Sequence, residues 1–227
     1  MPETRAGRRA ARSRRSRPLQ IVTVISVLAL VGAAAFFFFR EDGGNGDSRP
    51  KRVQEVSIGD LELTVGGVFP INAGPPAALP PEVQNAVMAT LGTYVEGGLI
   101  EPVRDGETSA DIASVFDAGA ATRLEGPDRS VLFDEGLPEV TKSFVPTAQP
   151  VIITALSDGA SAFVIATATL VYQATLETDE GTITVNRTAD LTMVPQPDAW
   201  RITSFDVIVA RDGPGIQTTT TTAVTAP

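Results

Sequence analysis

The second half of the chain alternates apolar and polar residues, which is the pattern of half-buried β-strands. The alternation begins near Gln149 and continues for about 60 residues. Short polar connections at residues 157–159 and 178–181 join the segments, so neighbouring strands are predicted to run antiparallel. The four predicted strands are Val151–Leu156, Ala162–Leu176, Thr182–Val194 and Ala199–Ala210.

A β-hairpin is predicted closer to the N-terminus, within Val53–Val65. Gly59 and Asp60 would form its two-residue turn, with the glycine first. On both sides of this turn apolar residues alternate with polar ones, and they are Val56, Ile58, Leu61, Leu63 and Val65.

Helical spacing of apolar residues separates these two regions. A first helix is predicted to begin at Pro80-Pro81, because proline suits the first turn of a helix. Gly97-Gly98 is expected to end it. Its apolar face consists of Val83, Val87, Leu91, Tyr94 and Val95.

A second helix is predicted after Thr108 or Ser109, with Asp111 in the first turn, where a carboxylate suits the helix dipole. An apolar piece at Val131–Phe133 and a short helix at Pro138–Phe144 are expected next. Helices followed by hairpin-linked strands indicate the α+β class, with helices packed on a curved antiparallel sheet and the hairpin added at the N-terminus. The apolar stripe of the second helix consists of Ile112, Val115, Phe116 and Ala120.

One apolar stretch is long enough to cross a membrane. Leu19–Phe39 contains no charged residue and matches a helix through a hydrocarbon core of about 30 Å. Seven arginines in residues 1–18 precede it, so the N-terminus is predicted to be cytoplasmic and the rest of the chain extracytoplasmic. The alternative is a cleaved signal peptide with Ala33–Ala35 as the cleavage site. The apolar run continues through Phe39, which favours a retained single-pass anchor in the cell membrane.

The remaining boundaries follow from composition. Residues 40–52 are glycine-rich and polar, as in a flexible linker, and residues 213–227 form a Thr-rich tail predicted to be disordered. The extracytoplasmic domain is therefore predicted to span residues 53–212. From Val53 onward the chain has seven basic and 23 acidic residues, a net charge of about −16. Such a domain is unsuited to nucleic acid, whose binding requires neutralisation of phosphates.

The chain contains no cysteine and no histidine. Disulfides and thiol nucleophiles are therefore excluded, and imidazole, the commonest metal ligand and usual general base, is absent. Carboxylates such as Asp128, Asp134 and Glu135 are scattered loop charges rather than a pattern of metal ligands. We therefore predict no enzymatic activity, no cofactor and no metal site.

The order of the predicted elements resembles that of a known family. Two helices, a short strand, a short helix and four long antiparallel strands, over about Pro81–Arg211, are similar to the nuclear transport factor 2-like (cystatin-like) cone fold. Asp198-Ala199-Trp200-Arg201-Ile202 resembles the aromatic-centred final strand of that superfamily. With the predicted anchor in front, the chain looks like Mce-associated membrane proteins and the extracytoplasmic cone-fold component of type IV secretion systems. The resemblance implies a pocket between the helices and the concave face of the sheet.

Arg187 shares an alternating face with apolar residues of its strand, and an unpaired buried charge costs several kcal/mol. It is therefore predicted to pair with Asp206, which lies on the same alternating face of its strand as Trp200 and Ile202, or with Asp117. The alternatives are binding of an anionic ligand and a sheet-edge position that reaches solvent. The candidates for lining a ligand pocket are Tyr94, Tyr172, Arg187 and Trp200, although residues at these spacings more often have structural roles in a core.

Three functions remain open at this point. The first is a non-enzymatic accessory protein docked in a cell-envelope, transport or secretion assembly, with the lipid bilayer (through residues 19–39) and an envelope protein as partners. The second is a module that binds a small apolar or anionic ligand in the cone pocket. The third is a His-free enzyme with an aspartate base, for which no pair of residues is singled out. The sequence does not define an oligomeric state.

Overall fold

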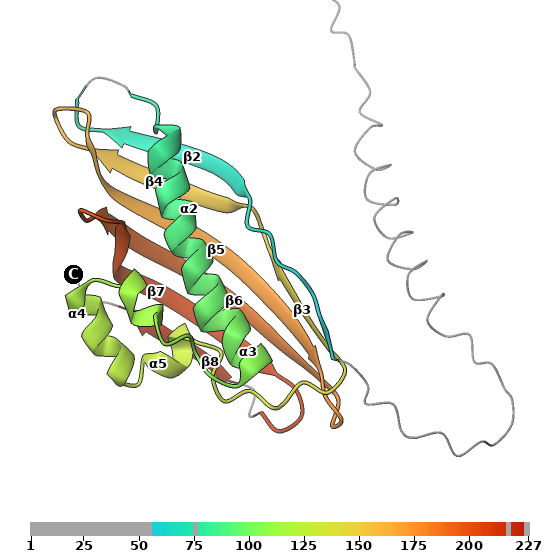
Figure 1. The fold of residues 1–227 in the computed structure, drawn as a ribbon. Coiled ribbons are helices and arrows are strands. Elements are labelled where there is room, and N and C mark those ends of the chain that lie inside the picture. The colour runs from blue at the N-terminus through green and yellow to red at the C-terminus, as the bar shows by residue number, and fades with distance from the viewer. Residues whose placement is uncertain (1–55, 75–76, 217–218, 225–227) are drawn as a thin grey trace, which may run out of the picture. The chain divides into compact units, whose positions relative to one another are not determined.

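The computed structural model describes residues 56–74, 77–216 and 219–224. These residues form a mixed α+β fold with a curved, open sheet and few helices (Figure 1), which confirms the predicted α+β class. The predicted basic segment 1–18, membrane helix 19–39 and linker 40–52 lie outside the described residues. Within the described part of the chain, no helix is long and apolar enough to cross a membrane.

Four antiparallel strands form the main part of the sheet, and they confirm the predicted strands. Their alternating burial follows from the pleat, which points successive side chains to opposite faces. β4 pairs with the first part of β5, β5 with β6, and β6 with β7. The four strands are β4 (Val151–Ser157), β5 (Phe163–Glu177), β6 (Thr182–Pro195) and β7 (Trp200–Asp212).

No helix forms at Pro138–Phe144, where a short one was predicted: residues 138–142 are irregular, and a further strand, β3 (Ser143–Ala148), begins at Ser143. It pairs antiparallel with the second part of β5. Phe144 and Pro146 are buried while Val145 and Thr147 are exposed, so the apolar positions follow the period of a strand. The helix prediction was therefore wrong.

The predicted N-terminal hairpin is not formed. β1 (Ser57–Ile58) pairs in parallel with β3, and β2 (Val65–Asn72) pairs in parallel with β4. Gly59 donates its N–H to the Phe144 carbonyl at 2.8 Å, which continues the pairing with β3 instead of closing a turn. The segment thus runs along one edge of the sheet in a single direction.

The C-terminal tail also departs from the prediction. Within residues 213–227, which were predicted to be disordered, β8 (Thr219–Val224) pairs antiparallel with the last part of β7. Threonine and valine are β-branched residues that favour strands. Ala223 packs inward and is 2% exposed. Low sequence complexity therefore does not prevent strand formation here.

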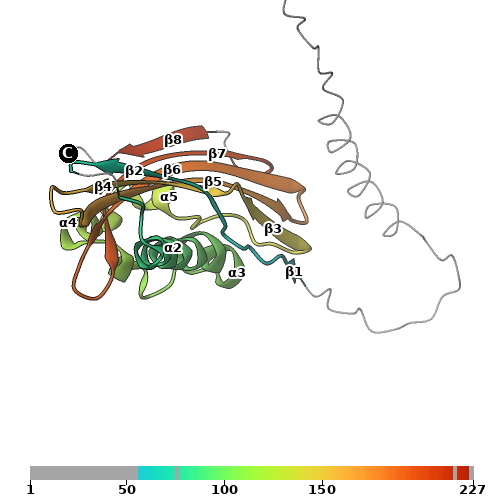
Figure 2. The ribbon, with the colours of Figure 1, turned by 90° about the horizontal axis from the view of Figure 1, so that it is seen from above.

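The predicted first helix is confirmed as α2 (Pro81–Val95), which begins after Pro80. It lies along the sheet, and the other helices cover the same face (Figures 1 and 2). In the described residues the helices lie on one face of the sheet, so the opposite face has no helical cover (Figure 2). The buried residues of α2 are Val87, Thr90, Leu91, Tyr94 and Val95.

The helix does not end at Gly97-Gly98 as predicted. The backbone continues through the π-helical turn η1 (Glu96–Ile100) and α3 (Glu101–Asp105) to Gly106, whose φ of 82° ends it. The two glycines instead permit close packing, because a Cβ on Gly98 would lie 2.8 Å from the Phe133 ring.

The predicted second helix is divided into short turns. Phe116 forms a bridge to Ile202 of β7, and the N–H of Asp117 donates to the Ile202 carbonyl at 2.9 Å, which interrupts the helix. All four residues of the predicted apolar stripe are nevertheless buried. The short elements are η2 (Ile112–Val115), α4 (Ala118–Ala121), η3 (Thr122–Glu125) and α5 (Arg129–Leu132).

Gly98→Ala is expected to destabilise the fold by about 1–3 kcal/mol, because its methyl group would overlap the Phe133 ring. Gly92→Ala is the matched control within α2, since no atom beyond the nearby backbone of its own helix and its chain neighbours lies within 4 Å of the Cβ it would add. This control should stabilise the fold by about 0.5–1 kcal/mol through helix propensity. Chemical denaturation of the purified chain measures both, and equal effects of the two substitutions would contradict the packing role of Gly98.

Candidate functional site

Three of the four predicted site residues lie in one region of the interior. Tyr94 comes from α2, Tyr172 from β5 and Arg187 from β6, and each is at most 1% exposed. Tyr172 and Arg187 are direct cross-strand partners. Trp200 starts β7, and its carbonyl accepts a hydrogen bond from the Thr90 hydroxyl at 2.8 Å. The four predicted residues therefore do not surround one pocket.

Arg187 is paired with Asp134 inside the domain. One guanidinium nitrogen, Nη2, donates to Asp134 Oδ1 at 2.6 Å, and the two side chains are 0% and 1% exposed. The other, Nη1, donates to the carbonyls of Val131 and Leu132, the latter at 3.3 Å. These carbonyls belong to the end of α5, where the helix leaves acceptors without partners. The guanidinium thus fixes the segment 131–134 over β6.

The predicted partners of Arg187, Asp206 and Asp117, were wrong. Asp206 lies on the exposed face of β7, opposite Asp190 of β6. Thr192 pairs with Ser204 but the next residue, Met193, pairs with Ile202, so β7 contains one extra residue at this point. An extra residue in one strand turns all later side chains of that strand to the other face of the sheet.

Asp117 is engaged elsewhere. Its carboxylate caps α4 by accepting the N–H of Ala120 at 2.7 Å.

Arg211 is a second cation on Asp134, and sequence reasoning missed both residues. Its Nη2 donates to Asp134 Oδ1 and to the Phe133 carbonyl, each at 2.9 Å. The side chain of Arg211 is 16% exposed, so water partly screens its charge. Beyond the register shift, Arg211 lies on the same inward-facing side of β7 as Val207 and Val209. This alternation is the one sequence signal that could have identified Arg211 as a residue of the cluster.

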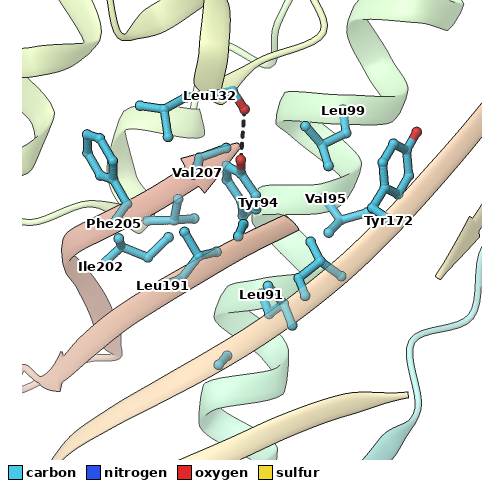
Figure 3. Close-up of a cluster of buried hydrophobic side chains, with 14 of the residues drawn as sticks. Leu91, Tyr94, Val95, Leu99, Leu132, Tyr172, Leu191, Ile202, Phe205 and Val207 are labelled. Carbon is cyan, nitrogen blue, oxygen red and sulfur yellow. Dashed lines mark hydrogen bonds between the residues drawn. The ribbon is translucent and has the colours of Figure 1, made fainter. Parts of the chain in front are cut away.

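Tyr94 contacts segment 131–134 from the side of helix α2. Its hydroxyl donates to the Leu132 carbonyl at 2.7 Å, as Figure 3 shows among the surrounding apolar side chains. The Tyr94 ring meets Phe116 edge-on at a centroid distance of 6.2 Å and lies 6.4 Å from Phe133. Side chains therefore fill the space between α2 and this part of the sheet.

Burial determines the protonation of both tyrosines. Burial raises the pKa of Tyr94 above its ordinary value of 10.0, although the Arg187 charge opposes the shift. Burial, assisted by the Asp134 carboxylate, also raises the pKa of Tyr172. Burial alone would lower the pKa of Arg187, but Asp134, Tyr94 and Tyr172 together outweigh it and the pKa is raised. The cluster therefore consists of two neutral phenols, one buried ion pair and the partly exposed Arg211.

Several polar atoms of the cluster lack a hydrogen-bond partner. They are Asp134 Oδ2, Tyr172 Oη, Arg187 Nε and Arg211 Nε. A buried hydroxyl without a partner lowers stability, so Tyr172 contributes packing rather than a hydrogen bond.

Four of the surface hollows in the described part of the domain lie elsewhere. One, of about 430 Å³, separates Leu61 and Leu63 from α2. Another, of about 300 Å³, is bounded by α2 and the start of β7, including Trp200. None of the four hollows is lined by Tyr94, Tyr172 or Arg187. Among the described residues, no group of three or more carboxylates is placed to hold a metal ion.

Neither family models, curated proteins nor solved structures give a match to this chain. Its function is therefore argued from the geometry of the domain alone. The geometry makes the Arg187–Asp134–Arg211 cluster a support for segment 131–134.

Asp134→Asn is expected to destabilise the domain by about 3–5 kcal/mol, because it leaves the buried Arg187 without a counter-charge. Asp206→Asn is the control, since Asp206 is exposed and faces another carboxylate, so its loss should change stability by less than about 0.5 kcal/mol. Arg187→Met combined with Asp134→Leu should recover most of the loss. Thermal unfolding of the four proteins compares them, and a neutral Asp134→Asn would contradict the assignment.

The two tyrosines give a second, opposed pair of variants. Tyr94→Phe should destabilise the domain by about 1 kcal/mol through loss of the bond to Leu132, whereas Tyr172→Phe should be neutral or stabilising. Above pH about 10 the unfolded chain releases phenolic protons that the folded chain retains, so the free energy of unfolding should fall as pH rises.

Because the chain has only these two tyrosines, tyrosinate absorbance reports them directly. The absorbance should rise together with loss of circular dichroism. A rise in the still-folded protein would contradict the burial of the phenols.

Proposed function

We propose that the chain is a non-enzymatic docking protein of a cell-envelope, transport or secretion assembly. In this proposal residues 19–39 anchor it in the membrane with a cytoplasmic N-terminus, and the α+β domain binds an envelope protein on the other side. The observation that carries the proposal is the contrast between a filled interior and apolar side chains on the helix-free face of the sheet.

The filled interior favours docking over a ligand in the cone pocket. Tyr94 and Arg187 donate hydrogen bonds to segment 131–134, and Tyr172 is buried beside Arg187 as its cross-strand partner. The long helix on one face of a curved antiparallel sheet supports the resemblance to the nuclear transport factor 2-like cone. The parallel pairing of β1 and β2 is a departure from the pattern expected for that family.

The docking surface that we propose is an apolar corner on the helix-free face. Ile71, Leu156 and Ile165 lie side by side in one row across β2, β4 and β5. Phe69 and Ile71 are 57% and 54% exposed, which is unusual for large apolar side chains. The apolar corner consists of Phe69, Ile71, Ile152, Leu156 and Ile165.

Charge indicates the kind of partner. From Val53 onward the net charge is about −16. Every arginine among the described residues is already in an ion pair with a carboxylate. The field outside the domain is therefore negative, and it favours a partner that presents an apolar anchor flanked by lysine or arginine.

Photo-crosslinking in cells tests the proposed surface. A photoreactive phenylalanine at Ile71 of the full chain should give an adduct with one envelope protein, and the crosslinked peptide should carry basic residues. The same probe at Asn186, which is exposed on the same face away from the corner, is the control. Phe69→Asp should reduce the Ile71 adduct at least fivefold. Identical adducts from both positions would overturn the assignment of the corner.

The proposed topology has its own test, made possible by the absence of cysteine. A single cysteine at exposed Thr147 should react with a membrane-impermeant maleimide in intact cells, while one at Ser13 should react only after lysis. Protection of Thr147→Cys in intact cells would contradict an extracytoplasmic domain.

A further inference from the structure

The two long edges of the sheet differ in how they are protected against further pairing. Among the described strands β2 pairs only with β4, and Pro70 in its middle has no N–H to donate. Its register also shifts between Val65 and Gly67, as in a β-bulge. These are two devices by which edge strands avoid pairing with other chains.

β8 forms the opposite edge and pairs only with β7 among the described residues. Its sequence, Thr-Thr-Thr-Thr-Ala-Val, contains no charge, no proline and no glycine. Its register with β7 runs without a shift from Thr219 to Val224. Thr220, Thr221 and Thr222 are exposed, and only the last carbonyl, of Val224, is held by another side chain, Arg123, at 3.0 Å. The edge is therefore regular and unprotected.

We propose that β8 pairs antiparallel with β8 of a second copy of this chain, so that two sheets join into one across a twofold axis. A threonine run is self-complementary in this arrangement, because it sets threonine opposite threonine. The same contact already exists within the sheet, where the hydroxyls of Thr167 and Thr192 lie 3.0 Å apart across β5 and β6.

The dependence on salt distinguishes pairing with a second copy of this chain from pairing with a basic strand of a different protein. Two copies, each with a net charge of about −16 from Val53 onward, repel one another, although no charge lies in β8 itself. Salt screens this repulsion, so pairing of two copies strengthens as ionic strength rises. A basic strand from a different protein would show the opposite dependence on salt.

The absence of cysteine allows a direct experiment on the full chain in membranes. Single cysteines at Thr220, Thr221 and Thr222 are oxidised with copper phenanthroline, and the disulfide-linked dimer is followed by non-reducing electrophoresis. At least one position should crosslink tenfold faster than Ile71→Cys on the other edge, and the rate should rise with salt. Rates no faster than at Ile71→Cys, or crosslinks only to a different protein, would overturn the proposal.

A charge swap excludes an effect on folding alone. In the background of the fastest cysteine position, glutamate is placed at the other two residues of Thr220–Thr222 in one variant and lysine in another. Each variant alone should crosslink at least fivefold more slowly than the parent, and co-expression of both should restore the rate. Equal rates for the separate and mixed variants would also overturn the pairing.

Discussion

The buried ion pair between Arg187 and Asp134 is the interaction on which the arrangement of the domain depends. It joins the central strand β6 to the segment that leads from the helices back to β3. A buried pair of this kind adds little stability over well-packed apolar residues, but it is satisfied in very few geometries. Arg187 finds two carbonyls and a carboxylate only when segment 131–134 lies directly over it. We infer that the pair selects one packing of the short helical turns, which at four residues each are too short to be stable alone.

The same interaction limits what the interior can do. Tyr94 and Arg211 add bonds to segment 131–134, so the polar groups that were candidates for ligand binding are used to hold the chain itself. The helix-free face of the sheet and its edges are left to meet other molecules. Function in this domain is therefore proposed at its surface, where apolar side chains at Phe69 and Ile71 have no cover among the described residues.

The parts of the fold that sequence reasoning predicted are those in which one period persists over many residues. The β4–β7 strands and α2 are of this kind, and the burial of Arg187 followed from parity along β6. Its partner did not follow, because one extra residue in β7 reverses that strand's parity and because Asp134 lies in an irregular segment. Alternation at residues 56–65 was equally compatible with a hairpin and with parallel pairing, since a local pattern does not specify the neighbouring strand.

The edge formed by β1 and β2 has a mechanical consequence. The described part of the chain begins near two-residue β1, continues through residues 59–64, in which Gly59 and Thr64 keep backbone hydrogen bonds to Phe144 and Val151, and then joins the sheet along eight-residue β2. A pull on the N-terminal side would load β1 first, and its short pairing with β3 would yield before that of β2. Release of residues 57–64 would lengthen the N-terminal connection and remove Leu61 and Leu63 from the edge of the core, while the buried ion pair stays intact. The domain thus contains a segment that can extend under load between its N-terminal end and the rest of the sheet.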